Sequence, residues 1–149
     1  MTYLLDVNVL IALLDEDHVS HGAAHDWFEQ TGTRGWATCA ITQNGYVRIV
    51  SAKSYGSKGW TLGEVRGLLQ DFCDRPGHEF WAADISLLDK GRFDHDQLTQ
   101  PGQITDAYLL ALAVRHGGRL ATLDRRLSPR SVRGGNVALM QIPPERSLA

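Results

Sequence analysis

The sequence predicts an α/β protein with a mainly parallel sheet of four to five strands, flanked by helices on both faces. Short apolar runs alternate along the chain with segments whose apolar residues recur at helical spacing. The runs at residues 3–7 and 119–124 end in carboxylates, as expected of buried strands that deliver side chains to the loop beyond them. Strands that alternate with helices favour a sheet covered on both faces.

The composition fits one domain spanning residues 1–149. With 43% hydrophobic residues, the chain can bury a substantial core. A charged fraction of 21% and a formal net charge of −2 exclude a disordered chain and one that holds nucleic acid by bulk charge. Cys39 and Cys73 lack metal-ligand spacing and are expected to be reduced. Neither a signal peptide nor a membrane span is expected, so we predict a cytoplasmic protein without membrane contact.

The first half of the chain is expected to contain two strands and three helices. Ser20 suits the N-cap of the second helix, and Gly32 suits its end. Apolar residues at helical spacing define the first and third helices. In chain order, the expected segments are a strand at 3–7, a helix at 9–14, a helix at 21–31, a strand at 36–39 and a helix opening at Ala40 or Thr42.

The middle of the chain is expected to contain a flexible connection, a helix and a strand. Residues 51–60 are rich in glycine, serine and lysine, which predicts an exposed, basic and mobile turn region. Thr61 and Glu64 have the spacing of a capping box, so a helix should begin there and end before Pro76. Residues 78–81 read as a third strand, and residues 91–102 as a polar loop.

The stretch 104–114 is expected to form the central helix of the fold. Its apolar positions fall on all sides of a helical wheel, which predicts burial. Thr105 suits the N-cap, and Asp106 suits the first turn, where a carboxylate complements the helix dipole. Strands at 119–124 and 137–142 should follow.

Three aspartates are placed to converge at one edge of this sheet. Asp6 and Asp124 each end a strand, and Asp106 begins the helix that precedes the second of those strands. Carboxylates packed together raise one another's pKa, and a divalent cation with oxygen ligands relieves the repulsion. Because no cysteine or histidine accompanies these aspartates, the pattern favours Mg²⁺ or Mn²⁺ over zinc.

Four segments then resemble the motifs of a known family. They are LDVNVLIALLD at 5–15, ITQNGYVR at 41–48, ITDA at 104–107 and TLD at 122–124. In this order and spacing, they are similar to PIN-domain ribonucleases, specifically VapC-type toxins of type II toxin–antitoxin systems. The resemblance covers nearly the whole chain and implies a PIN-like domain.

The resemblance implies a role for each matching site residue. Asp6, Asp106 and Asp124 match the metal-binding acidic residues, while Asn8 and Thr122 are placed to orient the pocket. Gln43 departs from the family, whose members often carry glutamate there, so the pocket should hold a second cation less well. The full set of expected catalytic residues is Asp6, Asn8, Gln43, Asp106, Thr122 and Asp124.

The resemblance also implies Mg²⁺- or Mn²⁺-dependent hydrolysis of RNA phosphodiester bonds, with inhibition of translation and growth. The implied partners are the RNA substrate and a VapB-type antitoxin, together with a toxin homodimer and a heterotetramer or larger complex with the antitoxin. Apolar contact surface for these partners is expected around Leu10, Leu14, Trp27 and Ile49. Basic residues that could contact the RNA backbone follow the central helix, at Arg115, Arg119, Arg125, Arg126, Arg130 and Arg133.

Two other classes of function fit parts of the sequence. A phosphoryl-hydrolysing enzyme also gathers aspartates at strand ends, but Asn8 stands where the paired motif of such enzymes has a second aspartate. A PIN-like module that only binds RNA or antitoxin is the other alternative, if Gln43 has weakened catalysis. RNA cleavage with and without metal distinguishes these classes.

Overall fold

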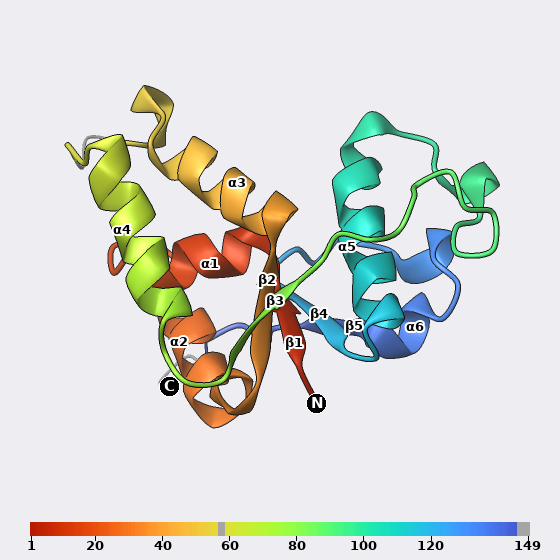
Figure 1. Ribbon diagram of the computed structural model, residues 1–149, viewed down its shortest axis with the longest axis horizontal. Coiled ribbons are helices and arrows are strands. Elements are labelled where there is room, and N and C mark those ends of the chain that lie inside the picture. Colours follow the sequence, from red (N-terminus) through yellow and green to blue (C-terminus); the bar gives the residue numbers. More distant parts are fainter. Residues whose placement is uncertain (57–58, 146–149) are drawn as a thin grey trace.

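The computed structural model describes residues 1–56 and 59–145, which form a single layer of parallel strands between two layers of helices (Figure 1). The five strands lie in the order β3-β2-β1-β4-β5, and every neighbouring pair is parallel. The predicted α/β fold is therefore confirmed. The strands are β1 (Tyr3–Leu5), β2 (Trp36–Cys39), β3 (His78–Trp81), β4 (Arg119–Thr122) and β5 (Leu139–Gln141).

The strand order reverses between β1 and β4. From β1 the chain builds outward through β2 to β3, and it then returns to add β4 and β5 on the other side of β1. At such a reversal the flanking connections leave in opposite directions, which opens a crevice at the carboxyl ends of the two strands. The residues after β1 and β4 therefore lie where an α/β sheet most often binds its ligand.

The helices divide between the two faces of the sheet. Four of them cover one face and two cover the other (Figure 1). Each face of the sheet has its own hydrophobic core, and alternate residues of β1 pack into the two cores. Leu4 packs towards α5, and Leu5 packs towards α1. The first group is α1 (Val7–Leu14), α2 (His21–Gln30), α3 (Ala40–Val50) and α4 (Leu62–Cys73); the second is α5 (Ile104–Arg115) and α6 (Gly135–Ala138).

The central helix α5 is buried on most of its surface, as its pattern predicted. Its residues 107 and 109–113 are all buried. The predicted N-cap, however, is wrong. A 3₁₀ turn at Pro101–Gln103 runs directly into α5, so that Gln103 occupies the N-cap and Thr105 lies exposed in the first turn beside Asp106.

Other segments differ from prediction in detail. The last strand is shorter than expected because α6 occupies the start of the predicted run, and the loop at 91–102 contains 3₁₀ turns. The expected connection at 51–60 falls partly on residues 57–58, which lie outside the described residues, and Trp60 at its end packs against the core. Leu10 and Trp27, expected at an interface, are instead buried within this chain because both pack in the core beneath α1 and α2. No helix in the described part of the chain is long and apolar enough to cross a membrane.

Two helix-interior glycines provide a matched test of how closely α3 packs against α1. A Cβ atom at Gly45 of α3 would lie 2.8 Å from Cγ2 of Val7, whereas one at Gly67 of α4 would meet nothing within 4 Å. Gly67→Ala should therefore raise the free energy of unfolding by about 0.5–1 kcal/mol, because alanine favours helix. Gly45→Ala should lower it by about 1 kcal/mol or more, because the new methyl group overpacks the contact.

Urea denaturation of both variants measures this difference. Equal stabilisation by the two alanines would show that α3 and α1 are not in close contact. Since α1 begins at Val7, immediately after Asp6, this contact also fixes the position of the first aspartate.

Candidate active site at the carboxyl ends of β1 and β4

Asp6 is buried at the junction between β1 and α1. It is the N-cap of α1, where its Oδ1 accepts a hydrogen bond of 2.7 Å from the Val7 amide. Its Oδ2 accepts a second bond, of 2.8 Å, from the Thr122 hydroxyl. Burial raises the pKa of the Asp6 carboxyl, these two hydrogen bonds oppose the rise, and the negative charge of Asp124 adds to it.

Thr122 connects the residues of this junction. It is the last residue of β4 and is fully buried. While its hydroxyl donates to Asp6, its oxygen accepts bonds from the Asp124 amide, at 3.1 Å, and from Nδ2 of Asn8, at 3.3 Å. The Asn8 side chain in turn accepts a bond of 3.1 Å from the Leu123 amide, which ties the start of α1 to the end of β4. Both residues expected to orient the pocket therefore lie beside Asp6.

Asp106 and Asp124 complete a group of three carboxylates that influence one another. Burial, followed by the charges of Asp6 and Asp124, raises the pKa of the half-buried Asp106 to about 6. Asp124 accepts a bond of 2.8 Å from the Arg126 amide, and its Oδ1 lies 3.8 Å from Nε of the same arginine. Asp106 and Asp124 line one cavity of about 320 Å³, which Ser131 also borders.

The chemistry of this group suits a hard divalent cation. Its ligand atoms are carboxylate oxygens, and the hydrogen bonds of Asp6 fix one of the three in place. Among the described residues, no three His, Cys, Asp or Glu side chains form a ready-made metal-ligand group.

Gln43 does not line the cavity that Asp106 and Asp124 border. Its Nε2 donates a bond of 3.1 Å to the hydroxyl of Thr38 in β2, and its side chain lines a different cavity, between α3, α4 and β3. The residue of α3 that faces the start of α1 is Gly45, two positions further on. The Gln43 amide is thus bonded to β2, and its expected effect on a second cation stays a prediction.

This placement changes the expected effect of restoring an acidic residue. Gln43→Glu should leave the affinity for Mn²⁺ unchanged within about twofold, because the new carboxylate would take the place of the amide beside Thr38 of β2. Isothermal titration calorimetry of the variant against wild type measures the effect. Clearly tighter Mn²⁺ binding by the variant would show that the side chain at position 43 interacts with the bound ion.

The six arginines after the central helix do not form one face. Arg115 pairs with Asp84, and Arg119 opens β4 at the end of the sheet opposite the carboxylates. Arg125 donates to the Ile142 carbonyl and Arg133 to that of Lys90. Arg126 alone of the six lines the carboxylate cavity, and its side chain is 95% exposed.

Sequence reasoning missed the polar wall of this cavity. Loop residues supply it, from the 3₁₀ turn before α5 and from the turn after β4. The available signals were weak, namely a Pro-Gly pair before the central helix and a Ser-Pro pair after the last aspartate. The wall residues are Gln100, Gln103, Ser128 and Ser131.

The fold, with three carboxylates gathered at one edge of its sheet, is that of a PIN domain, and comparison with known proteins agrees. The PIN domain family matches residues 3–131. Ribonuclease VapC44 of Mycobacterium tuberculosis H37Rv is 48% identical over 134 residues, which cover 90% of this chain and 94% of that protein. Ribonuclease VapC39 of the same strain is 44% identical over 128 residues, covering 86% and 92%. The chain therefore belongs to the VapC ribonucleases of the PIN-domain family.

A solved structure supports the fold independently. VapBC2 from Rickettsia felis, bound to a DNA fragment from its promoter, contains a chain that superposes with a TM-score of 0.57. The alignment covers 96% of this chain and 100% of that one at 14% sequence identity. At that identity the likeness concerns the fold alone.

Proposed function

We propose that this chain is a Mg²⁺- or Mn²⁺-dependent endoribonuclease that acts as the toxin of a toxin–antitoxin pair. The observation that carries the proposal is the gathering of Asp6, Asp106 and Asp124 at the strand-order reversal, where Asp106 and Asp124 line one cavity. The names of the VapC relatives support RNA as the substrate. The VapBC2 structure supports a VapB-type antitoxin as the partner. We further propose a toxin homodimer and a heterotetramer or larger assembly with the antitoxin.

Each site residue has a distinct task in this proposal. Asp6, Asp106 and Asp124 would hold the cation, which when bound activates a water and stabilises charge on the phosphoryl group. Thr122 and Asn8 hold the Asp6 carboxylate in one orientation through their hydrogen bonds. Arg126, exposed at the cavity, is placed to contact the RNA backbone.

Cleavage of RNA by the purified protein tests the proposal. A labelled RNA pool should be cut in Mg²⁺ or Mn²⁺, left intact in EDTA, and cut again when metal is restored. Loss of cleavage in Asp6→Asn would show that the activity belongs to this chain and not to a contaminating nuclease. Binding of RNA or antitoxin without cutting under any of these conditions would favour the binding-module alternative instead.

A further inference from the structure

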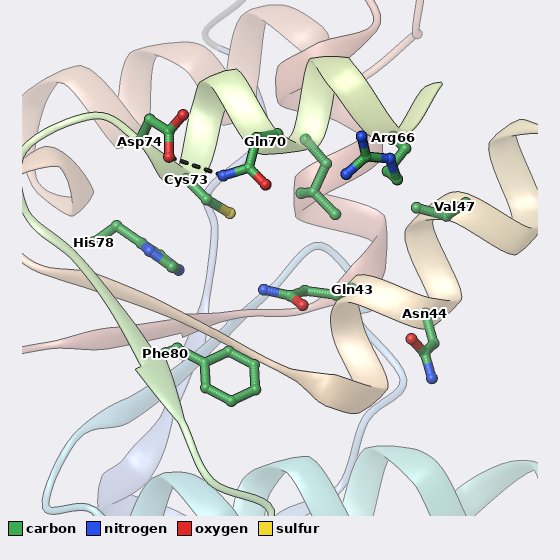
Figure 2. Close-up of a pocket in the computed structure, with 10 residues that line it drawn as sticks. Gln43, Asn44, Val47, Arg66, Gln70, Cys73, Asp74, His78 and Phe80 are labelled. Carbon is green, nitrogen blue, oxygen red and sulfur yellow. Dashed lines mark hydrogen bonds between the residues drawn. The ribbon is translucent and has the colours of Figure 1, made fainter. Parts of the chain in front are cut away.

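A second cavity, of about 580 Å³, lies between α3, α4 and the edge strand β3 (Figure 2). It shares no lining residue with the carboxylate cavity. Its volume falls within the range of small-ligand sites, about 300–1,000 Å³. The catalytic proposal uses none of its side chains, which leaves its polar lining to be explained.

The inner wall of this cavity is a fixed chain of hydrogen bonds. Burial lowers the pKa of His78, while its hydrogen bond to the Cys73 backbone favours the protonated ring, so the ring donates in that bond. Nε2 of His78 and the Thr38 hydroxyl form a hydrogen bond of 2.8 Å. The Thr38 oxygen then accepts from Nε2 of Gln43, over 3.1 Å. The Gln43 amide is thus held in one orientation, with its carbonyl oxygen left to accept from a ligand.

The outer wall carries an aromatic ring and a cation. Phe80 is 58% exposed although it is a large apolar side chain, and its ring lies at the cavity (Figure 2). Arg66 of α4 forms no ion pair with any described residue. Asp74 keeps its negative charge while its Oδ1 accepts a bond of 2.8 Å from Gln70, and it lies at the opposite end of the cavity from Arg66 (Figure 2).

This combination suits a nucleobase better than an apolar peptide side chain. Aromatic rings bind unpaired bases by stacking, carboxamides read base edges, and arginine contacts phosphate. A peptide's apolar side chain would instead bury the carboxamides of Gln43 and Asn44 without partners.

The cavity also lies close to the carboxylates along the sheet. Gln43 stands in the first turns of α3, directly after β2, and β2 pairs with β1, which ends at Asp6. Neighbouring strands are about 4.8 Å apart, so a single strand of RNA at the carboxylates can reach the cavity.

We propose that the cavity between α3, α4 and β3 binds a nucleobase of single-stranded RNA, with Phe80 stacking on the base, Gln43 accepting from its edge and Arg66 contacting its phosphate. The inference rests on the proposed ribonuclease function and adds a site that selects which RNA is bound.

Binding of a short, fluorescein-labelled single-stranded RNA in EDTA tests the inference without catalysis. Phe80→Ala should weaken binding by about 5- to 100-fold, while Phe80→Tyr, which keeps the ring, should retain it. Leu88→Ala serves as the matched control, since Leu88 is an exposed apolar residue outside the cavity. Arg66→Ala should lower the slope of log affinity against log salt by about 0.7, as expected for one lost phosphate contact.

An RNA of the same length with abasic sites identifies what Phe80 contacts. Wild type should bind the abasic RNA about as weakly as Phe80→Ala binds the normal RNA. Phe80→Ala should bind the abasic RNA only slightly more weakly than that, because both changes remove the same contact. Equal affinity of wild type and Phe80→Ala for the normal RNA, or no RNA binding by wild type, would overturn the inference. So would a loss of antitoxin binding in Phe80→Ala with RNA binding intact.

The two proposals fail separately. If wild type cleaves RNA, and Phe80→Ala binds and cleaves RNA equally well, the base site is ruled out and the proposed ribonuclease function stands. If RNA binding depends on the Phe80 ring but no RNA is cleaved in Mg²⁺ or Mn²⁺, the base site stands and the proposed ribonuclease function is ruled out.

Discussion

Asp106→Asn should reduce metal-dependent RNA cleavage by roughly 100-fold or more, because a catalytic cation contributes several kcal/mol of transition-state stabilisation. Among the three carboxylates this one gives the cleanest test. Asp6 also caps α1 and accepts from Thr122, and Asp124 accepts from the Arg126 amide, so changing either disturbs local structure. Asp106 is half-buried in the first turn of α5, where asparagine keeps the shape and removes the charge.

The same substitution should stabilise the metal-free protein at neutral pH. Because the pKa of Asp106 is raised from 3.8 to about 6, the folded chain binds more protons than the unfolded chain between those values. The free energy of unfolding of wild type in EDTA should therefore fall as the pH rises through that window. Asp106→Asn removes this loss, so its unfolding free energy should vary less between pH 4 and pH 6.

Thermal unfolding measures the stability of the metal-free protein in EDTA and the stabilisation that Mn²⁺ adds. Mn²⁺ should raise the melting temperature of wild type and leave that of Asp106→Asn nearly unchanged. Asp71→Asn, at an exposed position of α4, is the matched control and should behave as wild type. Full activity in Asp106→Asn, or an equal Mn²⁺ response in all three proteins, would contradict a role for Asp106 in holding the ion.

The features that sequence reasoning captured are those set by local pattern. Apolar runs that end in aspartate located β1 and β4, and the all-round apolar stretch located α5 with Asp106 in its first turn. Parallel strands bring their carboxyl ends to one edge, so the convergence of the three aspartates followed from the element order alone.

The features that sequence reasoning missed depend on which way a side chain points. Gln43 stands two residues before Gly45, and on a helix this spacing turns the two residues towards different neighbours, β2 for one and α1 for the other. Thr105 is not the N-cap, because the 3₁₀ turn before it moves the start of the helix to Ile104. The arginines that follow α5 along the chain separate in space because a strand and two turns intervene.

Thr122→Val should lower the free energy of unfolding by about 1–3 kcal/mol and lower kcat by about 10- to 100-fold. Valine has nearly the shape of threonine, but it cannot donate to Asp6 or accept from the Asp124 amide. The Asp124 amide would lose its partner, and the Asp6 carboxylate would lose the hydrogen bond that opposes the rise in its pKa. Thr122 is thus a positioning residue, and Thr122→Ser, which keeps the hydroxyl, should recover most of the rate.

Thr38→Val provides a control for stability when kcat is measured at saturating RNA, because Thr38 supports the base cavity through Gln43 and does not touch the aspartates. Thr38 and Thr122 are both fully buried, in the two strands that flank β1, but Thr38 bonds to His78 and Gln43 and not to the aspartates. Denaturation should show a similar loss in both valine variants, whereas kcat should fall only for Thr122→Val. An equal fall in kcat would mean that loss of stability, and not the orientation of Asp6, limits the reaction. An unchanged kcat in Thr122→Val would mean that the backbone and Asn8 orient Asp6 without it.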